Sequence, residues 1–159
     1  MRITKESEYA LRILVSLAKA GKQTDAGSLS AATSVPLRFT AKILRKLREA
    51  KLVSASKGAQ GGYRLAKAPS QITMLEAIEA IDGPVAISLC LSEDHACNHP
   101  DISECGCFFH NVFDRINEKI ISELGSTTIA MALGVPAAPC TGCHSGCAGC
   151  THSDSCHKS

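Results

Sequence analysis

The sequence lacks any apolar stretch that could cross a membrane, because no run approaches the roughly 18 uninterrupted apolar residues that a spanning helix requires. Charged side chains at Glu6, Glu8, Arg12 and Lys19 interrupt the N-terminal segment, so it does not resemble a secretory signal peptide. Both absences lead us to expect a cytoplasmic protein with no membrane partner. The length of 159 residues suits about one globular domain, and a hydrophobic content of 45% argues against wholesale disorder.

Motifs of the common enzyme classes are also absent. No nucleophile–base pairing and no cofactor-binding loop is evident in the sequence. The glycine-containing segment 58–62 (GAQGG) has neither the Walker spacing nor the dinucleotide-binding spacing. We therefore do not expect an enzyme.

Acidic residues are scarce in the first part of the chain. Residues 1–67 hold 14 Lys or Arg against 4 Asp or Glu, whereas residues 68–159 hold 3 against 11. The formal net charge of +2 hides this asymmetry. A basic half joined to an acidic half points to a polyanion as the partner of the first half.

Cysteine is absent before Cys90, and all nine cysteines lie at or beyond that position. In a cytosolic chain disulfides are disfavoured, and clustered thiols more often bind a metal or do redox work. Iron–sulfur or zinc chemistry is therefore expected in the second half.

The spacing of apolar residues predicts three helices and a hairpin in the basic half. Helices are expected over residues 7–20, over 27–32 and from Pro36 to about residue 52. Two short strands, 52–56 and 63–65, follow with a glycine-containing turn between them. This order is typical of a winged helix-turn-helix, in which one helix enters the major groove and the hairpin tip reaches the backbone or the minor groove.

The acidic half predicts two further helices. Residues 73–82 form one, ended by Gly83 and Pro84, and a loop then leads to a long amphipathic helix over about 107–124. One face of the long helix carries an apolar stripe made of Phe109, Phe113, Ile116, Ile120 and Leu124, widened by Phe108, Val112 and Ile121. This is more apolar surface than a small winged domain covers alone, so we expect it to pack against a second subunit.

The expected fold is mainly α, a winged helix-turn-helix DNA-binding domain with a β-hairpin wing and a long C-terminal dimerisation helix. We divide the chain into a DNA-binding domain (1–83), a cysteine loop with the dimerisation helix (84–133) and a Cys-rich tail (134–159) that is flexible or binds metal.

Three segments resemble the Rrf-two family of bacterial transcription regulators. They are MRITKESEYALRIL at the start, the pattern IxxxLxxxxLV over 43–53, and KGAQGGYRLAKAPSQIT over 57–73, whose GxxGGY is the most specific. The resemblance covers residues 1 to about 133 and implies a homodimeric winged-helix protein that binds double-stranded DNA. Many members hold an iron–sulfur cluster in the loop before the dimerisation helix, whereas CymR-like members hold none and are controlled by a partner protein.

Four cysteines within 18 residues precede or begin the long helix, and a histidine follows one turn later. Thiolates favour iron–sulfur clusters and zinc, and a histidine can replace one thiolate on an iron. The resemblance to IscR-like members implies the ligand set Cys90, Cys97, Cys107 and His110.

Two other residues compete for places in this set. Cys105 is an alternative third thiolate, and Glu8 of a partner subunit is an alternative fourth ligand, as in NsrR-like members. We favour a [2Fe–2S] cluster and keep [4Fe–4S] open. The alternative without a cluster is that these thiols are partly buried core residues.

The tail carries two CxxC pairs, Cys140–Cys143 and Cys147–Cys150, separated by three residues. Zinc ribbons separate such pairs by roughly 15–20 residues, so the tail would form a compact second metal or cluster site instead. A tail that binds no metal and oxidises readily is the equal alternative.

DNA contacts are expected from the third helix and from the wing. The residues, assigned from their charge or from the resemblance, are Pro36, Arg38, Phe39, Thr40, Lys42 and Lys46 on the helix and Lys57, Gly58, Gln60 and Arg64 on the wing. Cationic contacts to phosphates set affinity, and side chains in the groove set sequence choice. Ala41 occupies the position of a glutamate that tunes site choice in IscR, so the operator preference of IscR does not transfer to this chain.

The favoured hypothesis is a homodimeric transcription regulator whose cluster senses redox state, nitric oxide or iron–sulfur status and modulates operator affinity. One alternative is a cluster-free, CymR-like regulator. The other is a metal-handling protein or electron carrier, which leaves the basic half unexplained.

Overall fold

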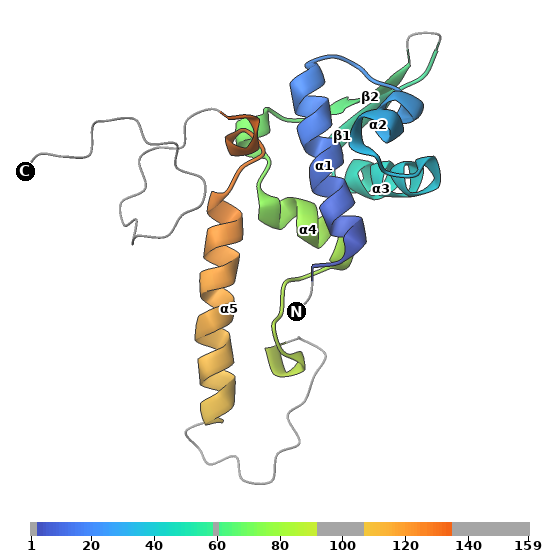
Figure 1. Cartoon of the computed structure of the whole chain (residues 1–159). Helices are drawn as coiled ribbons and strands as arrows, with labels where there is room; N and C mark the ends of the chain where they lie inside the picture. Colours follow the sequence, from blue (N-terminus) through green and yellow to red (C-terminus); the bar gives the residue numbers. More distant parts are fainter. Residues whose placement is uncertain (1–2, 59–60, 92–106, 135–159) are drawn as a thin grey trace, which may run out of the picture.

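The computed structural model describes residues 3–58, 61–91 and 107–134, and Figure 1 shows their arrangement. In chain order the elements are α1 (Lys5–Ala20), α2 (Ala26–Thr33), α3 (Leu37–Glu49), β1 (Val53–Ser56), β2 (Gly62–Leu65), η1 (Pro69–Gln71), α4 (Met74–Asp82), η2 (Leu89–Leu91), α5 (Phe108–Ser126) and η3 (Met131–Leu133), where η marks a short 3₁₀ helix. The described chain is mainly helical with one two-stranded hairpin after the third helix, as predicted.

Local chemistry fixes where the helices begin and end. The Thr4 side chain accepts a hydrogen bond from the backbone of Ser7 and begins α1, and Gly21 ends it at φ 61°, a conformation that favours glycine. The third helix ends at Glu49, three residues before the predicted end, because Lys51 adopts φ 58° and turns the chain into β1. The long helix begins at Phe108, with Cys107 as its N-cap, and continues to Ser126.

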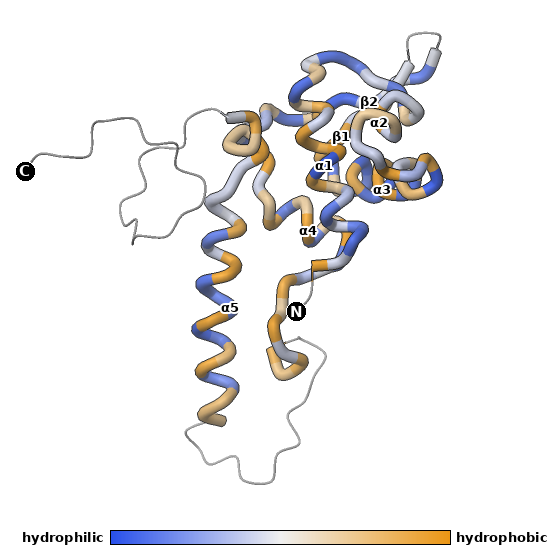
Figure 2. Tube along the Cα trace, viewed as in Figure 1, coloured by the Kyte–Doolittle hydropathy of each residue, from blue (hydrophilic) through white to orange (hydrophobic). Residues whose placement is uncertain are grey.

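One hydrophobic core joins α1 to α4 and the hairpin, which together we call the head. Ile13 and Leu14 of α1 are fully buried, as are Ile43, Leu44 and Leu47 of α3. Figure 2 shows the hydrophobic positions of these helices alternating with hydrophilic ones along each tube. The helical spacing of the apolar residues therefore supplies the core, and it leaves the charged positions of α3 at the surface.

The hairpin is tied to the segment that enters α2. Thr24 and Tyr63 exchange two backbone hydrogen bonds. The Thr24 nitrogen donates to the Tyr63 carbonyl at 2.9 Å, and the Tyr63 nitrogen donates to the Thr24 carbonyl at 2.8 Å. Gly62 makes this approach possible, because a Cβ there would lie 2.8 Å from the backbone carbonyl of Thr24. The wing and the helix-turn-helix are thus one packed unit.

A polar joint connects the end of α4 to the start of α1 and to α3. The Asp82 carboxylate accepts hydrogen bonds of 2.7 Å from the hydroxyls of both Thr4 and Ser7. The Lys46 ammonium of α3 donates to the carbonyl of Ile81 at 2.8 Å. The last residues of α4 are therefore held by two other helices of the head.

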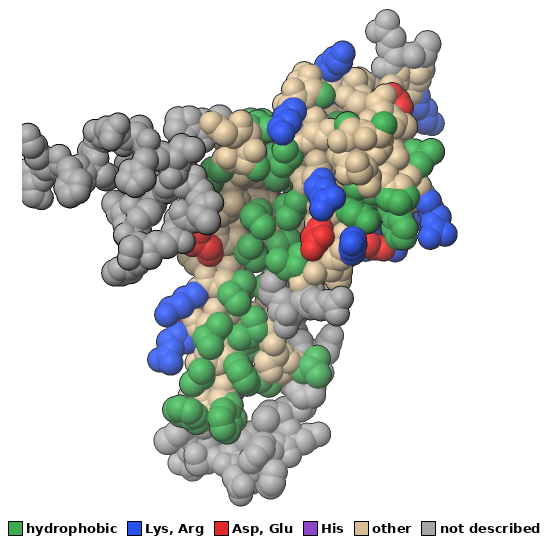
Figure 3. All heavy atoms as spheres, in the orientation of Figure 1, with side chains coloured by type: hydrophobic (Ala, Val, Ile, Leu, Met, Phe, Trp, Pro, Cys, Tyr) green, Lys and Arg blue, Asp and Glu red, His purple; other side chains and the backbone are tan. Residues whose placement is uncertain are grey.

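The long helix α5 extends away from the head, and its C-terminal end packs against α4 (Figure 1). Isolated bridging near that end joins Thr73 to Thr128, and Ile129 is buried in the head core. The N-terminal half of α5 exposes much of the predicted stripe, with exposed fractions of 73% for Phe108, 67% for Phe109, 37% for Phe113 and 42% for Ile116. Figure 3 shows these hydrophobic side chains gathered along the lower part of the helix.

No helix within the described residues is both long enough and apolar enough to cross a membrane.

We predict that the Asp82 joint makes stability depend on pH. Burial opposes the charge of Asp82, but hydrogen bonds from Ser7 and Thr4 outweigh it and lower the pKa of the carboxyl below its ordinary value. Because the pKa of Asp82 is lower in the folded state, its charge stabilises the fold fully above the unfolded-state pKa of about 3.9. This stabilisation is lost as the pH falls below that value and through the folded-state pKa. Asp82→Asn should reduce the free energy of unfolding by about 1 kcal/mol at pH 7, a value discounted for partial exposure.

Urea unfolding at pH 7 and at pH 3 measures this effect. The difference between wild type and Asp82→Asn should shrink at pH 3. Asp114→Asn, the same change at an exposed position of α5, should alter stability by no more than about 0.5 kcal/mol at either pH. Equal loss for Asp82→Asn at both pH values would contradict the prediction.

Candidate nucleic-acid interface and cysteine segment

The turn between α2 and α3 is fixed by hydroxyl groups that hold the buried Val35. The carbonyl of Val35 accepts hydrogen bonds from Ser30 at 2.7 Å and from Thr40 at 3.2 Å. Ser34 adopts φ 55°, and Pro36 precedes the first turn of α3. This geometry orients α3 as the exposed second helix of a helix-turn-helix.

The structure corrects one predicted DNA contact, that of Thr40. Its side chain is fully buried, and its hydroxyl faces the Val35 carbonyl inside the turn. It therefore holds the turn and has no access to a duplex. The sequence prediction treated it as a surface donor because a threonine among basic residues gives no signal of its direction.

Lys46 is also directed into the protein. Besides its hydrogen bond to Ile81, its ammonium lies 3.5 Å from the Glu6 carboxylate of α1, and the side chain is 28% exposed. Lys46 thus contacts α1 and α4 and helps to position α3. Because its side chain is partly exposed, it stays a predicted phosphate contact.

Lys42 remains at the surface but has an acidic partner. Its ammonium lies 2.6 Å from Glu6, with the lysine side chain 49% exposed. The hydrogen bond from Lys42 is the main cause that lowers the pKa of Glu6 below its ordinary value. A phosphate that approaches Lys42 must compete with Glu6.

The other predicted DNA-contact residues that the structure describes lie at the surface or close to it. Pro36 and Arg38 are exposed, and the Arg38 guanidinium lies 5.0 Å from the ring centroid of Phe39, which is half-buried against Tyr9. On the wing the exposed residues are Lys57, Gly58 and Arg64. Gln60 lies outside the described residues.

Arg45 and Arg48 were not among the predicted contacts, although both are exposed on α3. Arg45 makes a loose ion pair with Glu49 at 3.8 Å. The burial of Ile43, Leu44 and Leu47 could have identified them, because it leaves positions 45 and 48 facing outward.

Three of the four favoured cluster ligands, Cys90, Cys107 and His110, lie at described positions. Cys90 is in η2, which packs against α5, and Cys107 caps the N-terminus of α5 (Figure 1). Both thiols are free and partly exposed, and the Cys90 sulfur lies 3.2 Å from the Ser88 hydroxyl. His110 is partly exposed one turn into α5. The other predicted cysteine ligands lie outside the described residues: Cys97, Cys105, Cys140, Cys143, Cys147 and Cys150.

Glu8 lies exposed on α1. Within residues 3–58, 61–91 and 107–134, no three His, Cys, Asp or Glu side chains are grouped as a metal site. Cys90, Cys107 and His110 therefore do not form a three-ligand site by themselves.

Asn117 attaches the segment before Cys90 to α5. Its side-chain amide donates to the carbonyl of Val85 at 3.2 Å, and its oxygen accepts from the backbone nitrogen of Ile87 at 3.1 Å. With 8% exposure it is the buried polar residue of α5. Residues 81–87, which we call the connecting segment, are thus held by Lys46 at one end and by Asn117 at the other.

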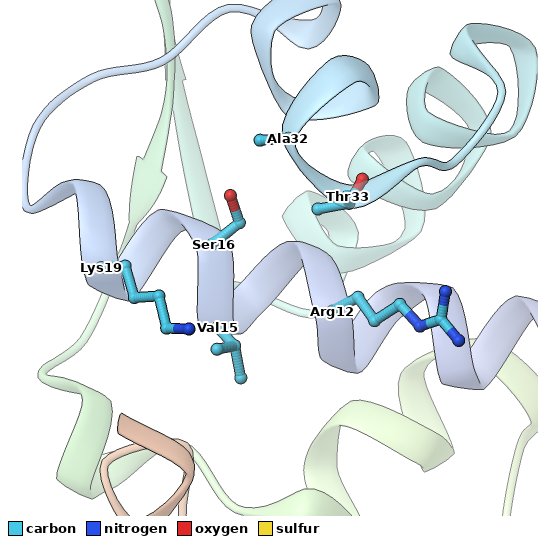
Figure 4. Close-up of a pocket in the computed structure, with 6 residues that line it drawn as sticks. All are labelled: Arg12, Val15, Ser16, Lys19, Ala32 and Thr33. Atoms are coloured by element: carbon cyan, nitrogen blue, oxygen red, sulfur yellow. The ribbon is translucent and has the colours of Figure 1, made fainter. Parts of the chain in front are cut away.

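A shallow groove of about 380 Å³ lies between α1 and α2, lined by Arg12, Val15, Ser16, Lys19, Ala32 and Thr33. Figure 4 shows Ser16 directed across the groove toward α2, whereas Arg12 points along α1 away from Lys19. The two cations do not converge on one point, and we assign no ligand to this groove.

Comparison with known proteins gives matches over most of the chain. The family model named Rrf2, described as an iron-dependent transcriptional regulator, matches residues 3–134. A protein of Rhodobacter capsulatus named as an rrf2-like HTH-type transcriptional regulator is 33% identical over 144 residues, which cover 86% of this chain and 96% of that protein.

Solved structures resemble the chain in fold. CymR, the global cysteine regulator of B. subtilis, has a TM-score of 0.68 at 24% identity, covering 86% of this chain and 99% of that chain. IscR of T. potens has a TM-score of 0.64 at 22% identity, covering 84% of this chain and 87% of that chain. These likenesses confirm the predicted winged helix-turn-helix fold.

We predict that Glu6 weakens binding to DNA. Glu6→Gln removes the carboxylate that pairs with Lys42 and should raise affinity for a duplex about two- to fivefold. It should also make the logarithm of affinity fall more steeply with the logarithm of salt concentration, by about one unit of slope, because one more cation meets a phosphate. Fluorescence anisotropy with a labelled duplex across a salt series measures both.

Glu118→Gln is the matched control, with the same charge change at an exposed position of α5. It should leave affinity and slope close to wild type. An equal gain for both variants would mean that overall charge, rather than the pair with Lys42, is responsible.

Proposed function

Because the chain belongs to the Rrf2 family of DNA-binding transcriptional regulators, we propose that it acts as a homodimer whose operator affinity is set by an iron–sulfur cluster. The membership itself confirms the family resemblance of the sequence and the prediction that the chain is not an enzyme. It also accounts for the basic first half, which a metal-handling protein or electron carrier leaves unexplained.

The observation that carries the cluster proposal is the pair of free thiols of Cys90 and Cys107, associated with the same helix α5. Thiolates and imidazole suit an iron–sulfur cluster, so the residues present fit this group. The proposed ligands are Cys90, Cys97, Cys107 and His110, with Cys105 and Glu8 as alternatives. Such a cluster would supply a redox-active centre that also reacts with nitric oxide, and we favour [2Fe–2S] over [4Fe–4S].

The family description as iron-dependent supports the same proposal. In this proposal residues 1–83 bind DNA, 84–133 form the cluster loop and dimerisation helix, and 134–159 form a tail that is flexible or holds a second metal site at Cys140, Cys143, Cys147 and Cys150. The proposed location is the cytoplasm.

The homodimer rests on the apolar surface of α5. Phe108 and Phe109 are mostly exposed in a single chain, and Phe113 and Ile116 continue the same surface. Exposed apolar patches of this kind mark interaction sites. A second copy of α5 would bury the patch with matching chemistry and bring two heads together on one operator.

The connecting segment is the route by which the cysteine region would bias the head. Asn117 fixes Val85 and Ile87 to α5, and Lys46 fixes Ile81 to α3. A change in position of the cysteine region is therefore transmitted to the recognition helix through a short stretch of backbone. A regulatory difference in affinity needs only about 1–3 kcal/mol between states.

A cluster-free regulator controlled by a partner protein is the second candidate. The likeness to CymR, titled a global cysteine regulator, favours it. The two candidates differ in one measurable property, the iron and sulfide content of the purified protein.

We predict that anaerobically purified protein contains iron and acid-labile sulfide, and that Cys90→Ala and Cys107→Ala each lose most of both. Cys107 makes no capping hydrogen bond through its side chain, so alanine should leave α5 intact. Cys143→Ala, the same change in the tail, should keep the iron of the 84–133 region. Elemental analysis and absorption spectroscopy provide the measurement.

Affinity for a duplex selected from a random pool should differ about tenfold or more between cluster-loaded and cluster-free wild type. Colourless wild type after anaerobic reconstitution would remove the cluster proposal and favour the cluster-free candidate. Either result leaves DNA binding in place.

We predict that Asn117→Ala reduces both stability and regulation. The change removes the two hydrogen bonds that join Asn117 to the backbone of Val85 and Ile87, so the free energy of unfolding should fall by about 1–3 kcal/mol. The ratio of duplex affinities between cluster-loaded and cluster-free protein should move toward one. Asn111→Ala, the same change at an exposed position of α5, should change neither quantity appreciably. A destabilised Asn117→Ala that keeps the full ratio would contradict the proposed route.

A further inference from the structure

The first turn of α3 exposes a leucine beside four exposed cations of the same helix. Leu37 is 54% exposed, and within α1 to α4 and the hairpin, as far as they are described, it is the one large apolar side chain that is mostly exposed. The other leucines of α3, Leu44 and Leu47, are fully buried. Its exposure therefore does not follow from the core pattern.

Leu37 begins a stripe along the outer face of α3. Ala41, Arg45 and Arg48 follow at helical spacing and are all exposed, whereas Thr40 and Ile43 are buried. The stripe is apolar at the N-terminal half of the helix and cationic at the C-terminal half. In a helix-turn-helix, the N-terminal residues of the recognition helix contact base edges, whereas cations flanking them contact phosphates.

The charge around Leu37 determines what covers it. Arg38, Lys42, Arg45 and Arg48 are exposed on the same helix, and the exposed acidic residue of α3 is Glu49 at its end. A second copy of this basic helix would be repelled, whereas a duplex is attracted. The apolar group that a duplex presents in its major groove is the C5-methyl of thymine.

We propose that Leu37, supported by Ala41, is a specificity-determining residue that packs against a thymine methyl in the major groove. Ala41 is short enough to let the helix approach the bases closely, and it adds a second methyl one turn further along the same face. This inference rests on α3 as the recognition helix of a DNA-binding regulator and is independent of any cluster.

The test uses the full-length protein and a duplex selected by it from a random pool. Each thymine is replaced in turn by deoxyuridine, which removes only the methyl, and the dissociation constant is measured by fluorescence anisotropy. At one thymine per half-site, deoxyuridine should weaken binding of the wild type about three- to tenfold. Leu37→Ala should weaken binding to the thymine duplex by a similar factor and should be insensitive to deoxyuridine at that position.

Two further variants separate methyl contact from other effects. Leu37→Met keeps an apolar side chain of similar volume and should retain the sensitivity to deoxyuridine. Arg45→Ala should weaken binding to thymine and deoxyuridine duplexes equally and lower the salt slope by about one. Because Leu37 is largely exposed, the alanine variant should keep the wild-type circular dichroism spectrum and melting temperature.

Wild type that tolerates deoxyuridine at every position would overturn the proposal while DNA binding stands. So would Leu37→Ala that retains the full deoxyuridine penalty, because another residue would then contact the methyl. Failure to bind any duplex in a salt-dependent manner would overturn the DNA-binding role together with this proposal.

Discussion

The hydrogen bond from Lys46 to the carbonyl of Ile81 connects the recognition helix with the chain that leads to the cysteines. At the other end of this short stretch, Asn117 holds Val85 and Ile87. Backbone held at both ends offers a short route between the two elements. In the proposed regulation the connecting segment links α3 to α5, and Glu6 and Asp82 add further contacts among α1, α3 and α4 at the same place.

The helices and the wing could be predicted from the sequence because their signals are local. The 3.6-residue period of the core positions, the glycines of the wing and Gly21 at the end of α1 each act within a few neighbours. Which polar side chains point outward depends on tertiary partners. The burial of Thr40 and the inward contacts of Lys46 were not foreseen, because Val35 and Ile81, which accept their hydrogen bonds, are identified only by the folded chain.

The candidate cysteine site shows the same division. The sequence located the cysteines and the helix that follows them, and the structure adds that Cys90 and Cys107 are free and partly exposed. Nothing in the sequence indicated that Asn117 would bind the connecting segment, since an asparagine between Ile116 and Glu118 resembles any polar position of an amphipathic helix. The value of Asn117 arises only from the backbone of residues 85–87 lying against α5.

The two backbone hydrogen bonds between Thr24 and Tyr63 bear on which spacing of operator half-sites the proposed dimer accepts. Because these hydrogen bonds attach the hairpin to the segment that enters α2, the wing and the helix-turn-helix meet a half-site as one packed unit. In the proposed dimer, adjustment to an operator is then confined to the relation between the two heads. A signal arriving through α5 would then alter the distance and rotation between the two heads, and with them the half-site spacing that the dimer accepts, rather than the sequence read inside each half-site.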